Sequence, residues 1–270
     1  MFSRCPRFCH RLRLVLLLLL LSATAAIAAK PLRICADPDN LPFSDSAGRG
    51  FDNRIAALVA HDLGRKPVYV AARSRRGFLR EQFNKNACDV LTGVPSGMRG
   101  VATTRPYYRS TYVFVTPARE HLQIASFQDP HLNGRRIGLQ ILEEDFSPPS
   151  LPLIRNGHAA QLVGFQSFGT GGGDIIRAVA DGRVGLAVVW GPVAGYFAAK
   201  QPSRLSLTPV SPAVDSSGVP FTYPITLAVH KSDTTLLRAL NASITRLEPQ
   251  IQKILAAYHV PMMPEARGAL

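Results

Sequence analysis

Apolar and polar residues alternate with two different periods along the first part of the chain. Short apolar runs predict three strands, at 32–36, 67–71 and 89–93. Between them, apolar residues at spacings of three and four predict two helices, at 50–64 and 77–86. An alternation of strands and helices is typical of a parallel sheet whose strands are connected by helical crossovers.

The same alternation restarts after a long apolar and β-branched stretch at 107–116, which predicts a strand. Further strands are predicted at 137–140, 160–165, 184–190 and 225–229, and helices at 174–180 and 192–200. The segment 201–219 is rich in proline and serine, a composition typical of loops. An amphipathic helix begins near Leu236, and we expect Pro249 to interrupt it.

Two α/β units of similar size, closed by a final strand and helix, predict a two-lobed α/β fold. The first lobe would be discontinuous, with residues 30–116 and 222–270, and the second would comprise residues 117–221. The chain would therefore cross between the lobes twice, near Thr116 and near Thr222. Two such crossovers form a hinge about which the lobes can close around a ligand.

The first 29 residues differ from the rest in composition. Four arginines and no acidic residue precede an apolar run at 14–21, and Ala26-Ile27-Ala28 forms an A-x-A cleavage site. This arrangement predicts a cleaved secretory signal peptide over residues 1–29, because a membrane-spanning helix needs about 20 apolar residues. We therefore expect an exported, periplasmic protein that does not span a membrane.

Cys35 and Cys88 are the two cysteines that remain once Cys5 and Cys9 have left with the signal peptide. In an oxidising compartment a lone pair of cysteines indicates a disulfide. Both residues fall at predicted strands, which favours a Cys35–Cys88 disulfide over the alternative of two buried free thiols.

The mature chain is strongly basic. Without the four signal-peptide arginines, 27 of the 31 Lys and Arg residues remain against 18 Asp and Glu residues, a net charge of +9. Such a balance suits nucleic acid, an acidic membrane surface or an acidic protein partner. Export argues against nucleic acid. The densest basic cluster is interpreted as a solvated face, with docking to an acidic periplasmic protein as the alternative: Arg73, Arg75, Arg76, Arg80.

Several short motifs resemble, in their order and spacing, those of the type II periplasmic binding proteins of ABC importers. They are GFD at 50–52, CDV at 88–90, RPYY at 105–108, LNGRRIG at 132–138 and DGRV at 181–184. The resemblance covers nearly the whole mature chain. It implies a two-lobed, hinged fold with a ligand cleft between the lobes.

Other segments are similar to the narrower MoxJ/XoxJ family. They are ICADPDNLPFS at 34–44, CDVLTGVP at 88–95, DIIR at 174–177 and VVWGPVAGY at 188–196. Members of this family are binding-protein homologues associated with PQQ-dependent methanol dehydrogenases. The resemblance implies a periplasmic role in assembling or activating such a quinoprotein dehydrogenase, with the dehydrogenase and its cytochrome c as candidate partners.

Two positions distinguish an amino-acid receptor from a protein that binds a partner segment. Amino-acid binders of this fold usually hold the ligand carboxylate with an arginine after the third strand, where Arg99 lies here. They usually place an aspartate for the ligand's ammonium group where this chain has Trp190 and Gly191. This departure argues against a free amino acid and favours a more apolar cleft. A surface arginine and a core tryptophan are the alternatives.

The other candidate cleft residues come from the crossovers and from loops at the carboxyl ends of strands, where ligands bind in this fold. They are Asp37, Phe43, Ser96, Tyr107, Tyr108, Gln140 and Tyr223. Packing in the core or hinge is the alternative for each aromatic residue.

Motifs for catalysis, cofactors and metals are missing from the sequence. The Gly-rich run at 169–174 lacks the ending of a P-loop, and the acidic run at 143–145 lacks EF-hand spacing. The histidines are scattered, and there is no G-x-S-x-G elbow. We therefore expect a binding protein without metal or cofactor that is not an enzyme.

The preferred hypothesis is a monomeric accessory protein of a periplasmic PQQ-dependent methanol or alcohol dehydrogenase, which binds a partner segment in its interlobe cleft. The first alternative is an ABC-importer receptor for a small polar or amino-acid-like ligand. The second is an enzyme of the cyclohexadienyl dehydratase type on the same fold, for which the cleft loops offer no convincing acid/base pair.

Overall fold

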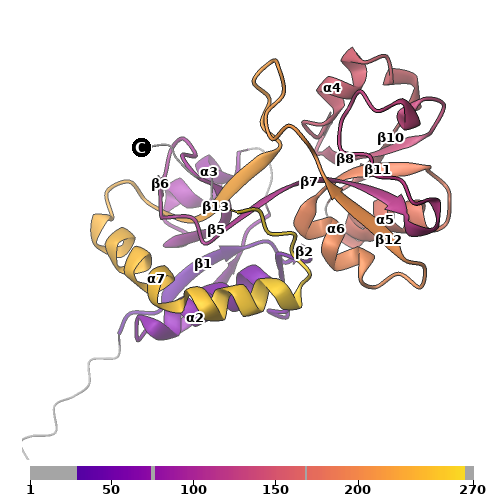
Figure 1. The fold of residues 1–270 in the computed structure, drawn as a ribbon. Coiled ribbons are helices and arrows are strands. Elements are labelled where there is room, and N and C mark those ends of the chain that lie inside the picture. The colour runs from indigo at the N-terminus through magenta and orange to yellow at the C-terminus, as the bar shows by residue number, and fades with distance from the viewer. Residues whose placement is uncertain (1–28, 74–76, 168, 265–270) are drawn as a thin grey trace, which may run out of the picture. The chain divides into compact units, whose positions relative to one another are not determined.

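Apart from β2 and β3, which pair only with each other, the strands form one continuous mixed sheet that is divided between two lobes (Figure 1). The strand order is β10-β8-β11-β7-β13-β5-β1-β4, with β12 beside β7, β6 beside β13 and β9 beside β8. The computed structural model describes residues 29–73, 77–167 and 169–264. The predicted signal peptide up to residue 28 and the cluster arginines Arg75 and Arg76 lie outside these ranges.

The first lobe combines the beginning and the end of the described chain. Its strands are β1 (Leu32–Ala36), β2 (Asp39–Asn40), β3 (Ser44–Asp45), β4 (Pro67–Ala71), β5 (Val90–Pro95), β6 (Ala102–Thr103) and β13 (Thr222–Val229). Its helices are α2 (Phe51–Asp62), α3 (Phe78–Glu81) and α7 (Thr234–Ala257). Strands β4 and β5 flank β1 in parallel, as the strand–helix alternation predicts, and β13 lies antiparallel to β5.

The second lobe repeats this design with a parallel centre. Its strands are β8 (Ile137–Leu142), β9 (Asp145–Phe146), β10 (Leu162–Gln166), β11 (Leu186–Trp190) and β12 (Leu205–Pro209). Its helices are α4 (Ser150–Arg155), α5 (Asp174–Ala180) and α6 (Gly191–Ala198). Strands β10 and β11 flank β8 in parallel. The predicted α/β fold with two lobes is therefore confirmed.

Strand β7 (Tyr108–Pro117) belongs to both lobes. Its first residues pair with β13, so that Ser110 lies opposite Tyr223. Its later residues pair with β11 and β12, and Tyr112 lies opposite Trp190. The chain thus leaves the first lobe along β7 and returns beside it along β13, which is the arrangement that a two-crossover hinge requires. The lobe boundaries near residues 116 and 222 stay a prediction.

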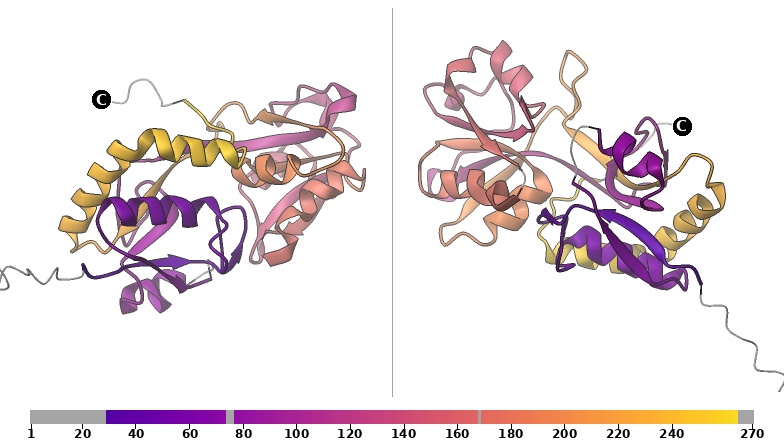
Figure 2. Two further views of the ribbon diagram at one scale, coloured as in Figure 1. Left: turned by 90° about the horizontal axis from the view of Figure 1, so that it is seen from below. Right: turned by 180° about the vertical axis from the view of Figure 1, so that it is seen from behind.

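Each lobe has its own apolar core. In the first lobe, α2 and α7 lie side by side against the sheet (Figure 2), and both contribute to one buried cluster that includes Phe51, Ile55 and Leu240. In the second lobe, Val113 and Ile175 belong to one buried cluster, and Tyr112 and Phe114 belong to another. Burial of such side chains, at about 25 cal/mol per Å² of apolar surface, is the main stabilising contribution.

Helix α7 continues through Pro249, so the predicted interruption is wrong. Proline removes one backbone hydrogen bond, which costs about 3 kcal/mol in a helix interior. However, Leu247 and Ile251, on either side of it, are both buried in the first-lobe core. Because the buried face continues past the proline, packing of this face outweighs the lost hydrogen bond.

Two other expectations differ from the structure in detail. The predicted helix at 77–86 is only α3 followed by one 3-10 turn, Phe83–Lys85, with Phe83 buried. Strand β12 lies within the segment expected to be a loop, and it pairs with β7 over its five residues. Of the apolar residues in the predicted helix only Phe83 is fully buried. The place of β12 depends on its pairing with β7, which local sequence does not indicate.

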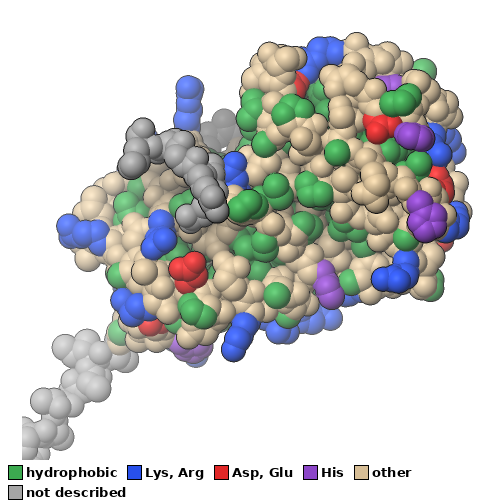
Figure 3. Space-filling model, in the orientation of Figure 1, with side chains coloured by type: hydrophobic (Ala, Val, Ile, Leu, Met, Phe, Trp, Pro, Cys, Tyr) green, Lys and Arg blue, Asp and Glu red, His purple; other side chains and the backbone are tan. Residues whose placement is uncertain are grey.

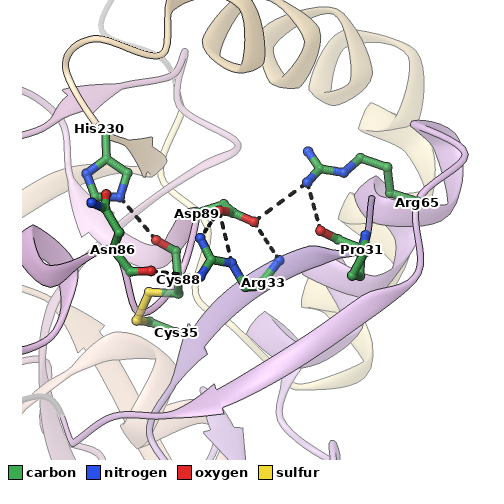
Figure 4. A network of polar contacts seen from close by, with 8 residues as sticks. All are labelled: Pro31, Arg33, Cys35, Arg65, Asn86, Cys88, Asp89 and His230. Carbon is green, nitrogen blue, oxygen red and sulfur yellow. Dashed lines mark hydrogen bonds and ion pairs between the residues drawn. A yellow bond between two sulfur atoms is a disulfide. The ribbon is translucent and has the colours of Figure 1, made fainter. Parts of the chain in front are cut away.

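A disulfide joins Cys35 of β1 to Cys88, two residues before β5 (Figure 4), and confirms the predicted pairing. The next residue, Asp89, accepts hydrogen bonds from Arg33 Nη2 at 2.6 Å and Nε at 3.2 Å, and its Oδ2 lies 3.6 Å from Arg65 Nη2. Burial acts to raise the pKa of Asp89, but the hydrogen bonds from Arg33 outweigh it and hold the pKa below its ordinary value. This network fixes β1 to the start of β5.

No helix in the described ranges is long and apolar enough to cross a membrane.

Candidate binding site

Three aromatic rings meet where the two lobes share their strands. The rings of Trp190 and Tyr112 are 5.4 Å apart, and those of Trp190 and Tyr223 are 5.8 Å apart, both in edge-to-face geometry. We call Trp190, Tyr112 and Tyr223 the aromatic junction. Trp190 is half-buried and packs against the cores of both lobes. Burial raises the pKa of the Tyr112 and Tyr223 hydroxyls, so both stay neutral.

Two contacts fix the backbone around Trp190: a hydrogen bond from its backbone N–H to a buried side-chain amide, and the close approach of Gly191 to β7. The Trp190 N–H donates to Gln140 Oε1 at 2.7 Å, and Gln140 is buried. Gly191 begins α6, and a Cβ there would lie 2.6 Å from the carbonyl oxygen of Thr111. Because only glycine fits at this position, β11 can turn directly into α6 against β7. The structure therefore brings the predicted site residues Gln140, Trp190 and Gly191 together.

An open pocket of about 610 Å³ lies on the second lobe and reaches Tyr223 of the junction. Its walls come from β9, the start of α4 and the segment before β13: Asp145, Phe146, Pro148, Ser150, Leu151, Ser217, Gly218, Val219, Pro220, Tyr223. Phe146 is 39% exposed and Leu151 is 50% exposed. Except for Tyr223, none of these residues was predicted from the sequence. The only signal for them is the presence of large apolar side chains in a Pro-rich loop.

The loop after β1 extends toward the second lobe. Phe43 packs at 5.4 Å from Phe51 in the first-lobe core and also contacts the second-lobe cluster that contains Val113 and Ile175. Asp37 is buried in the same loop, where its side chain accepts the Asp39 N–H at 3.1 Å. The structure thus brings Phe43 to the meeting point of the lobes and uses Asp37 to shape the loop.

Tyr107 and Tyr108 lie in the first-lobe core, in accordance with the core-packing alternative. The Tyr107 hydroxyl donates to Asp52 Oδ1 at 2.8 Å and accepts the Gly93 N–H at 3.1 Å. Burial raises the pKa of Asp52 to about 7, even though the hydrogen bond from Tyr107 acts to lower it. Tyr108 packs edge-to-face against Phe51 at 5.9 Å. A direct ligand contact for these two tyrosines stays a prediction.

Ser96 and Arg99 lie on the exposed turn that follows β5. The Ser96 N–H donates to the carbonyl oxygen of Pro224, next to Tyr223, at 2.9 Å. The turn is therefore anchored beside the crossover strand. Arg99 is exposed and makes no ion pair with another described residue. Its role as a carboxylate anchor stays a prediction.

Small and aromatic residues of α6 pack the second lobe against the first. A Cβ at Gly195 would overlap the carbonyl oxygen of His259, which shows how closely α6 approaches the segment after α7. Tyr196 of α6 stacks on Tyr258 at 5.6 Å, and Arg54 of α2 lies 5.5 Å over the Tyr258 ring. These contacts connect the two lobes beside the aromatic junction.

Metal chemistry finds no support among the described residues, where no group of three His, Cys, Asp or Glu side chains is placed to hold an ion. What the arrangement offers is an apolar and aromatic surface with a few polar groups at its margin. Such a surface is suited to apolar or aromatic groups.

The fold and this site define a solute-binding protein. The family model for bacterial extracellular solute-binding proteins, family 3, matches residues 32–260, and the chain belongs to this family. It is a MoxJ-like periplasmic binding protein: it is 31% identical to protein MoxJ of Methylorubrum extorquens over 90% of this chain and 86% of that protein. It is 29% identical to protein MoxJ of Paracoccus denitrificans over 92% of this chain and 95% of that protein.

Solved structures agree with this assignment. The crystal structure of MxaJ from Methlophaga aminisulfidivorans MPT superposes with a TM-score of 0.76 at 25% identity, covering 86% of this chain and all of that one. Periplasmic binding protein XoxJ from Methylobacterium extorquens AM1 gives a TM-score of 0.72 at 30% identity, covering 87% of this chain and all of that one. An ancestral cationic amino acid solute-binding protein, at 19% identity and a TM-score of 0.65, shares the fold.

Proposed function

We propose that this protein is an accessory factor of a periplasmic PQQ-dependent methanol or alcohol dehydrogenase and binds a segment of that partner at the aromatic junction and its pocket. The relation to MoxJ and XoxJ over most of the chain supports this proposal. The observation that carries it is the half-buried Trp190, which precedes Gly191 where amino-acid binders usually have an acidic anchor, and which contacts Tyr223 beside an apolar pocket.

The pocket has the chemistry of a site for a peptide segment. Its volume of about 610 Å³ lies within the usual range for ligand sites, about 300–1,000 Å³. Large apolar side chains that stay exposed at one place on a surface mark an interaction site, and Phe146 and Leu151 are of this kind. Aromatic side chains in such a pocket typically contribute most of the binding energy.

The polar candidates have a secondary role in this proposal. Asp37, Ser96 and Arg99 come from first-lobe loops, and they would contact polar groups of the bound segment. A carboxylate of the segment would suit the guanidinium of Arg99. The two lobes would then contribute different chemistry to one ligand, apolar from the second and polar from the first.

Calorimetry with the full mature chain tests the function. Titration with a purified PQQ-dependent methanol dehydrogenase should give saturable binding, whereas amino acids, organic acids and free PQQ should give none at millimolar concentration. Micromolar binding of a small ligand together with no binding of the dehydrogenase would favour the importer-receptor alternative. Normal dehydrogenase activity and growth on methanol after deletion of the gene would also contradict the proposal.

A matched pair of variants tests the site. Phe146 and Tyr69 are 39% and 40% exposed, but only Phe146 lines the pocket, and Tyr69 lies on β4 of the first lobe. We expect Phe146→Ala to weaken dehydrogenase binding by about 10-fold or more, the effect typical of an aromatic hot spot. Tyr69→Ala should leave the affinity unchanged. Equal affinities for the two variants would remove the pocket from the binding site.

A further inference from the structure

Four neighbouring strands of the second lobe each place an arginine at the same end of the sheet. The strands lie in the order β8-β11-β7-β12, with β7 antiparallel to β11 and β12, so the end of β7 lies beside the starts of the other three. Arg136 and Arg204 directly precede β8 and β12, Arg119 follows the end of β7 by two residues, and Arg183 precedes β11 by three. We call these four residues the arginine edge.

Backbone hydrogen bonds hold these positions close to one another. The Ala118 N–H, next to Arg119, donates to the carbonyl oxygen of Arg204 at 3.0 Å. The Gly185 N–H, two residues after Arg183, donates to the carbonyl oxygen of Arg136 at 2.9 Å. Lys and Arg side chains are visible along the outer margin of the second lobe (Figure 3). The arginine edge is therefore fixed by the register of the sheet.

The positive charge of this edge is largely uncompensated. Arg119, Arg136 and Arg204 are exposed and have no ion-pair partner within the described residues. Arg183 is 4.0 Å from Asp181, and the side chains of both are more than half exposed. Pairs of this kind contribute little, because water screens them. The nearby acid Glu120 is already paired with a fifth arginine, Arg135, at 2.6 Å.

We propose that the arginine edge is a docking surface for an acidic patch on a partner protein. The inference rests on the proposed function for its partner, the dehydrogenase. Guanidinium groups suit protein carboxylates because they donate parallel hydrogen bonds in a planar fork. A row of four such groups attracts an acidic surface and accelerates encounter more than it tightens the final complex.

An acidic membrane surface fits this edge less well. Peripheral membrane segments combine basic residues with apolar side chains that enter the lipid. The large apolar side chains found exposed in the described ranges lie elsewhere, for example Phe146 and Leu151 near the other end of β8. The six residues of β8 span roughly 20 Å, more than twice the Debye length of about 8 Å at physiological salt. The edge and the pocket are thus separate in both position and chemistry.

Two triple charge reversals test the inference. The first is Arg119→Glu, Arg136→Glu and Arg204→Glu. The matched control is Lys231→Glu, Arg238→Glu and Lys253→Glu, three exposed first-lobe residues with no ion-pair partner in the described part of the chain. Both change the net charge equally. Association and dissociation rates with the dehydrogenase are measured at 20 mM and 500 mM NaCl, and thermal unfolding of each variant checks the fold.

We expect the edge variant to associate about 10- to 100-fold more slowly than wild type at low salt, with little change in the dissociation rate. The difference should shrink at high salt, and the control should lose much less. Equal rates for the two variants would overturn the edge as a docking surface while leaving the proposed function intact. An absence of any wild-type binding would overturn the proposed function and this inference with it. Edge-dependent binding to anionic vesicles, with unchanged dehydrogenase binding, would assign the edge to a membrane.

Discussion

The two lobes share one sheet but are stabilised differently. In the first lobe, β1 and β5 are joined by the Cys35–Cys88 disulfide and by the ion pair of Arg33 with Asp89. The second lobe contains no disulfide in its described part, and apolar packing stabilises it. Its exposed apolar side chains and its arginine edge lie at opposite ends of β8. The first lobe is therefore the cross-linked one, and the proposed function and docking surface would place most of the binding contacts on the second lobe.

Removal of the disulfide should have the largest effect on the difference in stabilisation between the two lobes. Its cysteines are 53 residues apart, and a loop of that length predicts about 4 kcal/mol of stabilisation from the lower entropy of the unfolded chain. Cys35→Ala with Cys88→Ala should lower the free energy of unfolding by about this amount in urea titrations. A loss below about 1 kcal/mol would mean that the disulfide does not hold the first lobe together.

The buried Asp52 should make the stability of the first lobe depend on pH. Its pKa is about 7 in the folded protein, against an ordinary value near 4, so the folded state binds the proton more tightly than the unfolded state. The stability that this group contributes is full below about pH 4 and is lost as pH rises to about 7. Asp52→Asn, which keeps the acceptor for Tyr107, should remove this loss and gain a few kcal/mol at pH 8 relative to wild type.

Asp45 is a control of opposite sign. Burial acts to raise the pKa of Asp45, but the hydrogen bonds from Arg49 outweigh it and leave the pKa below its ordinary value. Its contribution to stability is therefore present at neutral pH and is lost as pH falls below about 4. Asp45→Asn should be destabilising at pH 7 and nearly neutral in acid. Parallel pH profiles for the Asp52 and Asp45 variants would contradict both assignments.

The second lobe depends on smaller contributions. Gln140→Leu removes the acceptor of the Trp190 N–H, a bond of 2.7 Å with Gln140 only 4% exposed. An unsatisfied buried donor costs about 1–3 kcal/mol, so we expect a loss in this range, smaller than the loss on removing the disulfide. Thermal unfolding measures the stability. An unchanged stability would show that the backbone N–H of Trp190 is bound by another acceptor in the variant.

Much of the architecture follows from local sequence, because apolar periodicity and turn residues are local signals. The strands β1 and β11 and the helix α5 were predictable in this way. The disulfide was predictable because only two cysteines remain after the signal peptide. Strand β12 was not, because its place depends on pairing with β7. The predicted helix interruption at Pro249 was wrong because burial of Leu247 and Ile251 in the first-lobe core outweighs the effect of a local helix breaker.

The site was less predictable than the fold. Trp190, Gly191 and Gln140 follow from strand ends, and they lie together in the structure. Phe146 and Leu151 line the pocket although they lie outside any predicted strand, because the β8–β9 turn and α4 bring them beside Tyr223. Tyr107 lies in the first-lobe core, where its hydroxyl donates to Asp52. Side-chain direction at a strand end depends on long-range packing.

The proposal that a partner segment binds at the aromatic junction can be tested most directly at Trp190, because this residue is the only tryptophan in the chain. The protein can be labelled with 5-fluorotryptophan, which gives a single ¹⁹F resonance from the aromatic junction. We predict that unlabelled dehydrogenase shifts or broadens this resonance and that Phe146→Ala weakens the response, while amino acids leave it unchanged. An unchanged resonance in a complex shown to form, or a shift caused by a free amino acid, would contradict the account.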